Sequence, residues 1–143
     1  MQSKVVYTQS LVLPSTIEAV GRVCRQLLEQ AKEYGYAEDE IFAIHLSLEE
    51  ALTNAVRHGN QSDSAKTVAI EALITPEKFD ISIADQGSGF NPDTLPDPRL
   101  GENLYKTEGR GVLLIRAYMD LIEYNERGNC VHLVKYKGTR NKV

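Results

Sequence analysis

The segment from Glu38 to Asn60 constrains the fold most, because its apolar residues recur with the period of an α-helix. The residues that share one stripe of this helix are Ile41, Ile44, Leu48, Leu52 and Ala55. Such a stripe has to be buried against another layer of the fold, so we expect a long helix packed on a core. Glu50 and Asn54 are four residues apart and lie about one turn from each other on a different face of this helix.

This polar face carries groups that are able to do chemistry. Glu50 is a carboxylate that can accept a proton, and the carboxamide of Asn54 can bind a hydrated divalent cation. Ala43 and Ser47 share the face and are small, which leaves room for a ligand. On these residues alone a solvent-exposed polar face is a better interpretation than a functional site. The choice between the two depends on the other motifs of the chain.

The composition excludes several classes of function. With 143 residues the chain has the size of one domain, residues 1–143, with a single core. A net charge of −4, the lack of a basic run and the lack of tryptophan argue against nucleic-acid binding. No apolar stretch reaches the ~20 residues of a membrane span or the length of a signal peptide, which predicts a cytoplasmic protein. Cys24 and Cys130 lack metal-ligand spacing, so we interpret them as two buried thiols in a reducing compartment.

Periodicity and turn signals predict the other elements. A first helix should begin at the capping box Ser15-Thr16-Ile17-Glu18 and end at Gly35. We expect strands at residues 5–13, 68–74, 79–83, 121–124 and 131–136, and a short buried helix at residues 112–119. Helices and hairpins that follow one another in groups are typical of an α+β fold. We therefore predict a two-layer α/β sandwich with a mixed, mainly antiparallel sheet and the helices on one face.

Two glycine clusters bracket a segment rich in proline. The first, Gly87 and Gly89, follows a predicted strand, and the second, Gly109 and Gly111, precedes the short helix. Glycine lets the backbone approach a ligand closely, and the N–H groups at a helix N-terminus can bind an anion. The segment between the clusters, residues 91–108, is long and contains three prolines, which predicts a lid over a bound ligand.

The ordered set of these residues resembles the GHKL ATPase superfamily and its Bergerat nucleotide-binding fold. The stretch from Glu50 to Asn54 is similar to the N box, Asp85 to Phe90 to the first glycine box, and Gly109 to Gly111 to the second. Within the superfamily the chain is most similar to the stand-alone anti-sigma-factor serine/threonine kinases. The resemblance covers nearly the whole chain.

The resemblance implies a role for each residue of the set. Asn54 would bind the Mg²⁺ that bridges the phosphates of ATP, and Glu50 would be the general base that activates the attacking hydroxyl. Asp85 would accept a hydrogen bond from the adenine amino group. The backbone around adenine and phosphates would come from Gly87, Gly89, Gly109, Arg110 and Gly111. Phosphoryl transfer depends mainly on positioning, a metal ion and a base near the nucleophile, which agrees with these roles.

Partners also follow from the resemblance. The substrate would be a STAS-domain anti-anti-sigma protein, a sigma factor or similar regulator would be bound, and the chain would form a homodimer. Arg22 would contact the protein substrate, because the family uses its first helix at the partner surface. The alternative is a nucleotide-dependent module that holds a partner without transferring phosphate. Glu50 favours the kinase, since related sensor histidine kinases commonly have asparagine at that position.

One residue departs from the family pattern. Many relatives have threonine in the final hairpin, where it helps to hold adenine through water, but this chain has Cys130, which is a poor hydrogen-bonding substitute. We therefore expect the details and the affinity of adenine recognition to differ. Among the histidines, we interpret His58 as a helix-end residue near the site, and His45 and His132 as structural residues.

Overall fold

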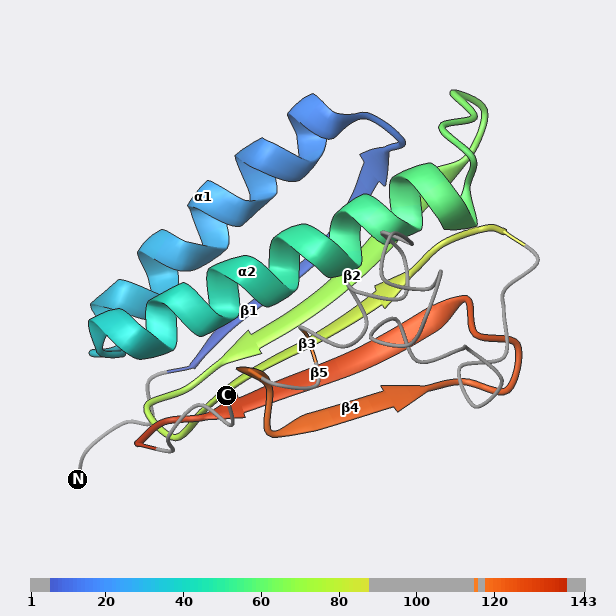
Figure 1. The fold of residues 1–143 in the computed structure, drawn as a ribbon. Helices are drawn as coiled ribbons and strands as arrows, with labels where there is room; N and C mark the ends of the chain where they lie inside the picture. Colours follow the sequence, from blue (N-terminus) through green and yellow to red (C-terminus); the bar gives the residue numbers. More distant parts are fainter. Residues whose placement is uncertain (1–5, 88–114, 116–117, 139–143) are drawn as a thin grey trace, which may run out of the picture.

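The computed structural model describes residues 6–87, 115 and 118–138 of the chain (Figure 1). The elements in chain order are β1 (Tyr7–Pro14), α1 (Ile17–Glu33), α2 (Glu38–Asn54), η1 (Ala55–Gly59), β2 (Thr67–Ile74), β3 (Lys78–Ala84), β4 (Leu121–Tyr124) and β5 (Cys130–Tyr136). Each of the five strands predicted from alternation is present, with ends that differ from the prediction by no more than about two residues.

The described strands form one sheet in the order β1-β2-β3-β5-β4, and every neighbouring pair is antiparallel. Alternate residues of the central strands are buried, and those of β2 and β3 are Val68, Ile70, Ala72, Ile74, Phe79, Ile81 and Ile83. Both α1 and α2 lie on the same face of the sheet (Figure 1). The predicted α+β sandwich with its helices on one face is confirmed, although the described strands form a wholly antiparallel sheet rather than a mixed one.

The N-terminus of α1 differs in detail from the predicted capping box. The N-cap is Thr16, whose hydroxyl accepts a hydrogen bond from the Ala19 N–H at 3.2 Å. The Ser15 hydroxyl instead donates to the Lys66 carbonyl at 2.8 Å, across 51 positions of the sequence. Both hydroxyls are able to cap a helix locally, and the long-range contact with Lys66 is what separates their roles. Gly35 follows the helix with a φ of 86°, as a helix-ending glycine requires.

The second helix carries the predicted site residues. It begins where the Glu40 carboxylate accepts a hydrogen bond from the Ala37 N–H at 2.8 Å, and its first turn is acidic, which suits the helix dipole. The predicted stripe is buried at Ile44, Leu48, Leu52 and Ala55 and partly buried at Ile41. The helix ends in the π-helical turn η1, where the Asn60 N–H donates to the Ala55 carbonyl at 2.8 Å.

Only part of the predicted helix at residues 112–119 falls within the described residues. Ile115 and Tyr118 are helical, and the Met119 N–H donates to the Ile115 carbonyl at 2.9 Å. The ring of Tyr118 meets Phe42 of α2 edge-on, with ring centroids 5.8 Å apart. In the part of the chain that the structure describes, no helix is long and apolar enough to cross a membrane.

Candidate functional site

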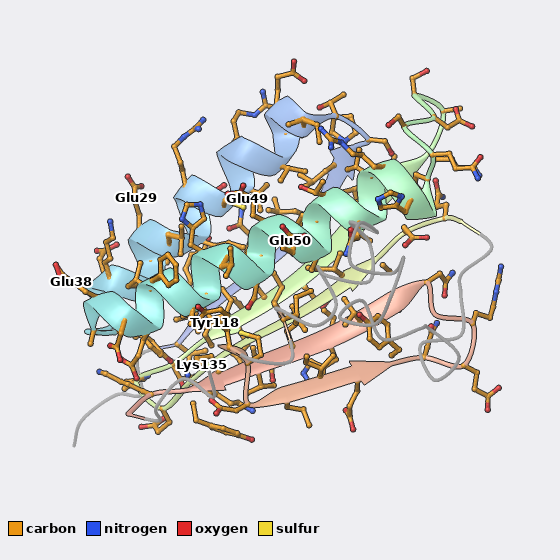
Figure 2. The ribbon with its side chains drawn as sticks, viewed as in Figure 1. Glu29, Glu38, Glu49, Glu50, Tyr118 and Lys135 are labelled. Carbon is orange, nitrogen blue, oxygen red and sulfur yellow. The ribbon has the colours of Figure 1, made fainter. Side chains whose placement is uncertain are left out.

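Glu50 and Asn54 lie on α2, one turn apart, and both residues are partly exposed. Figure 2 labels Glu50 on this helix. Within the described residues no hydrogen bond or ion pair occupies either side chain, so both groups are available to a ligand. The two small residues predicted to share their face, Ala43 and Ser47, are buried rather than open to solvent. The Ser47 hydroxyl has no hydrogen-bond partner among the residues described.

Asp85 follows the last residue of β3, where the chain leaves the sheet. Its backbone N–H donates to the Asn129 carbonyl at 2.8 Å, and its carboxylate accepts a hydrogen bond from the Gly87 N–H at 2.8 Å. Burial raises the pKa of this carboxyl, while the Gly87 hydrogen bond and the charge of Lys66 act in the opposite direction. The structure therefore holds a half-buried carboxylate in a fixed orientation, which is able to accept a further hydrogen bond from a ligand.

The end of α2 and the loop after β3 are in close contact through two glycines. A Cβ atom added at Gly59 would lie 2.3 Å from the Asp85 carboxylate, and one added at Gly87 would lie 1.9 Å from the Gly59 carbonyl oxygen. Gly87 therefore has no space for a side chain beside the Gly59 backbone, whereas a side chain at Gly59 would require the Asp85 carboxylate to move. This contact brings Asp85 to the C-terminal end of the helical segment that carries Glu50 and Asn54.

Asp85 lies at the C-terminal end of η1, and Asn54 and Glu50 follow in that order back along the helix. Gly59, which touches Asp85, comes five residues after Asn54 and nine after Glu50, and Glu50 lies about 6 Å farther along the α-helix than Asn54. A long ligand lying parallel to α2 would meet a carboxylate, then a carboxamide, then a second carboxylate. This order suits a molecule with a polar head at one end and a reactive group at the other.

Asn60 is a buried residue of the site that the sequence analysis did not identify. Its side-chain N–H groups donate to the Ser15 hydroxyl and to the Thr67 carbonyl, each at 2.9 Å. Its side-chain oxygen accepts a hydrogen bond at 2.7 Å from the N–H of Gln86, the residue between Asp85 and Gly87. An asparagine after a helix-ending glycine usually marks only a turn, and its partners are too far away in sequence to be predicted from pattern.

Cys130 lies beside Asp85, because it pairs with Ala84 in the register of β3 and β5. Burial raises the pKa of its thiol, and the negative charge of Asp85 raises it further. Cys24 in α1 is buried, as predicted, and its pKa is raised to about 12, whereas Cys130 is only partly buried rather than buried. The departure from the family pattern at Cys130 thus falls next to the predicted adenine carboxylate.

The remaining predicted residues fall into two groups. The lid at residues 91–108 and the site residues Gly89, Gly109, Arg110 and Gly111 lie outside the described residues. Arg22 is exposed on α1, and His58 is exposed in η1 at the end of the site. His45 pairs with Glu49 at 3.1 Å, and His132 contacts Asp80 at 2.8 Å on the sheet, away from Glu50 and Asn54.

A family model of the histidine kinase-like ATPase domain matches residues 13–135. The chain belongs to this family. The serine-protein kinase RsbW of Listeria monocytogenes serotype 4a (strain HCC23) is 27% identical over 134 residues, which cover 89% of this chain and 85% of the relative. The anti-sigma F factor of Clostridium perfringens (strain SM101 / Type A) is 31% identical over 106 residues, which cover 69% and 73%.

A solved structure of the RsbU and RsbW domains of Rv1364c from Mycobacterium tuberculosis has the same fold as this histidine kinase-like ATPase domain. The TM-score is 0.62 at 19% identity, and the match covers 96% of this chain but 34% of the longer protein. Together these relatives confirm the resemblance to the GHKL superfamily and its anti-sigma-factor kinases.

Proposed function

We propose that this chain is a protein serine/threonine kinase that uses MgATP to phosphorylate a STAS-domain anti-anti-sigma protein. The observation that carries the proposal is the order of Asp85 at the end of η1, then Asn54, then Glu50 on α2, which is the order of base, metal-bound phosphates and reacting phosphoryl group that ATP would need. Membership of the histidine kinase-like ATPase family supports the use of ATP. The names of the relatives RsbW and anti-sigma F factor support kinase activity and a role in sigma-factor regulation.

Asp85 would accept a hydrogen bond from the adenine amino group. Its carboxylate is oriented by the Gly87 N–H and lies in a half-buried position, where a charged hydrogen bond contributes more than it does in water. Around the nucleotide, the resemblance assigns further backbone contacts to Gly87, Gly89, Gly109, Arg110 and Gly111.

Asn54 would hold the magnesium ion. No group of three or more histidine, cysteine or acidic residues that could bind a metal exists among the described residues. Mg²⁺ that binds together with a nucleotide keeps several waters and needs only one or two protein ligands besides the phosphates. The unoccupied carboxamide of Asn54 is such a ligand, and the bound ion would neutralise charge on the phosphates.

Glu50 would act as the general base. A serine hydroxyl of the substrate attacks the γ-phosphorus, its proton passes to the Glu50 carboxylate, and the bond from phosphorus to the β–γ bridging oxygen breaks to release ADP. The Glu50 side chain has no partner among the described residues that would compete for this role.

The resemblance supports further parts of the proposal. The protein would act in the cytoplasm as a homodimer, bind a sigma factor or similar regulator, and present the exposed Arg22 of α1 to its protein substrate. The second candidate is a module that binds the same partners in response to nucleotide but transfers no phosphate.

Incubation with γ-labelled ATP, Mg²⁺ and a STAS-domain protein encoded beside this chain tests the proposal. The kinase predicts label on a serine or threonine of the STAS-domain protein, and EDTA should prevent it. Stable nucleotide-dependent binding without any label would contradict the kinase and support the binding module.

A further inference from the structure

We infer that Asn60 is a positioning residue that holds the Asp85 loop against the end of α2, so that the adenine-binding carboxylate is preset relative to Asn54 and Glu50. The inference rests on the proposed role of Asp85 in adenine recognition. Asn60 itself would not touch the nucleotide and would act only through the loop.

The hydrogen bonds of Asn60 fix its orientation. Its side chain is fully buried and offers two N–H donors and one carbonyl oxygen. The Thr67 carbonyl can only accept and the Gln86 N–H can only donate, so the amide cannot turn over without losing both bonds. All three groups of the side chain are therefore occupied, and the amide oxygen faces the Asp85 loop.

The partners of Asn60 come from the segments that meet at the site. Ser15 precedes α1, Thr67 starts β2, and Gln86 lies between Asp85 and Gly87. Asn60 directly follows η1, so one side chain joins the helix that carries Asn54 and Glu50 to the loop that carries Asp85. A second bond holds the same loop to the start of β2, where the Gln86 side-chain oxygen accepts a hydrogen bond from the Thr67 N–H at 2.8 Å.

The close contacts of the two glycines show why this junction matters. The Asp85 carboxylate packs directly against the Gly59 backbone. A shift of the loop would therefore change the position of the carboxylate relative to the end of the helix. Preset groups contribute more to affinity than groups that must be ordered on binding, because the cost of ordering has already been met in folding. Loss of the Asn60 anchor should therefore weaken recognition of the base and leave recognition of the phosphates intact.

Asn60→Ala tests the inference, with Ser15→Ala as the matched control. Ser15→Ala removes hydrogen bonds to Asn60 and Lys66 but leaves the bond from the Gln86 N–H to Asn60. Calorimetry with MgATP, MgGTP and magnesium tripolyphosphate, which has no base, distinguishes binding of the base from binding of the phosphates. For Asn60→Ala we expect MgATP affinity to fall about tenfold and the preference over MgGTP to shrink, because the freed loop must be ordered on binding. Tripolyphosphate affinity should change by less than about twofold, and Ser15→Ala should keep the wild-type preference.

Equal losses for ATP and tripolyphosphate in Asn60→Ala, or a preference lost equally in Ser15→Ala, would show a merely structural role and overturn the inference. A wild-type chain that binds ATP and GTP equally would overturn the adenine role of Asp85, and the inference with it. If Asn60→Ala does not fold, hydrogen exchange in the nucleotide-free wild type still tests whether Asn60 holds the loop. The Gln86 amide should exchange as slowly as the amides within β3, and exchange at the rate of an open loop would contradict the anchor.

Discussion

At the scale of single residues, Asp85 combines a structural cost with a functional use. Burial raises the pKa of its carboxyl, so the ionised form is less favourable in the folded chain than in water. Because the pKa in the folded chain is the higher one, the folded chain binds the proton more tightly, and protonation of Asp85 stabilises the fold as the pH falls through that pKa. The same protonation removes the acceptor for adenine.

Asp85→Asn should therefore separate stability from binding. At neutral pH the variant loses a desolvated charge, so we expect its melting temperature to equal or exceed that of the wild type. Loss of a charged hydrogen bond costs about 1.5–3 kcal/mol, so MgATP affinity should fall roughly ten- to a hundredfold. A melting temperature that falls together with the affinity would show that Asp85 holds the fold rather than the nucleotide.

Asn54→Ala should remove the metal dependence of nucleotide binding. The carboxamide has no partner among the described residues, so its loss should leave the fold intact. Calorimetric titration of ATP with and without Mg²⁺ measures the effect. An unchanged MgATP affinity would contradict the assignment of Asn54 as the magnesium ligand.

The two cysteines predict a pattern of thiol reactivity. The thiolate is the reactive form, and burial raises the pKa of Cys24 to about 12, so this residue should resist iodoacetamide at pH 8 until the chain unfolds. Cys130 is partly exposed with a raised pKa, so it should react more slowly than free cysteine, and MgATP should slow it further. Mass spectrometry of the alkylated chain provides the measurement. Rapid labelling of Cys130 that is unaffected by MgATP would place it outside the nucleotide pocket.

At the scale of secondary-structure elements, the important contact is that between the end of α2 and the loop after β3. Gly59→Ala adds a methyl group where the Asp85 carboxylate lies 2.3 Å away, so the carboxylate has to move. We expect a loss of MgATP affinity of about tenfold or more with little loss of stability, since alanine favours a helix by roughly 1 kcal/mol over glycine. Gly21→Ala is the control, because its new Cβ would make only an ordinary contact with Arg25 at 3.6 Å. Equal nucleotide affinities in the two variants would contradict the role of this contact.

The elements also show what the sequence could predict. Alternation in residues 68–74 and 79–83 and the stripe from Ile41 to Ala55 depend on local spacing, so strands and helix were predictable from pattern. The choice of Thr16 over Ser15 as the N-cap depends on Lys66, and the role of Asn60 depends on Ser15, Thr67 and Gln86. Contacts between residues so far apart in sequence are a result of the tertiary fold and leave no local pattern.

Across the whole domain, one end of the sheet carries structural hydrogen bonds and the other end carries the candidate site. At one end, the Tyr36 hydroxyl donates to the Thr75 carbonyl at 2.8 Å, and the Lys137 ammonium group donates to the Tyr34 carbonyl at 2.7 Å. These bonds join the connection between the helices to the β2–β3 turn and to the chain after β5. At the other end lie the end of β3, the start of β5 and the end of α2 (Figure 1), and with them Asp85 and Cys130. The fold thus fixes α2 at one end and presents the candidate site at the other.

Glu50 is the proposed base for phosphoryl transfer, and single-turnover kinetics of Glu50→Gln are the decisive measurement of this role. The substitution keeps the shape of the side chain, so affinities for MgATP and for the STAS-domain partner should change by less than about twofold. Removal of a general base typically lowers the rate by ~10²–10⁴, and transfer of γ-phosphate to the partner should slow by that factor. Transfer at the wild-type rate would contradict the role of Glu50, and a wild-type chain that binds its partner but never phosphorylates it would contradict the kinase itself.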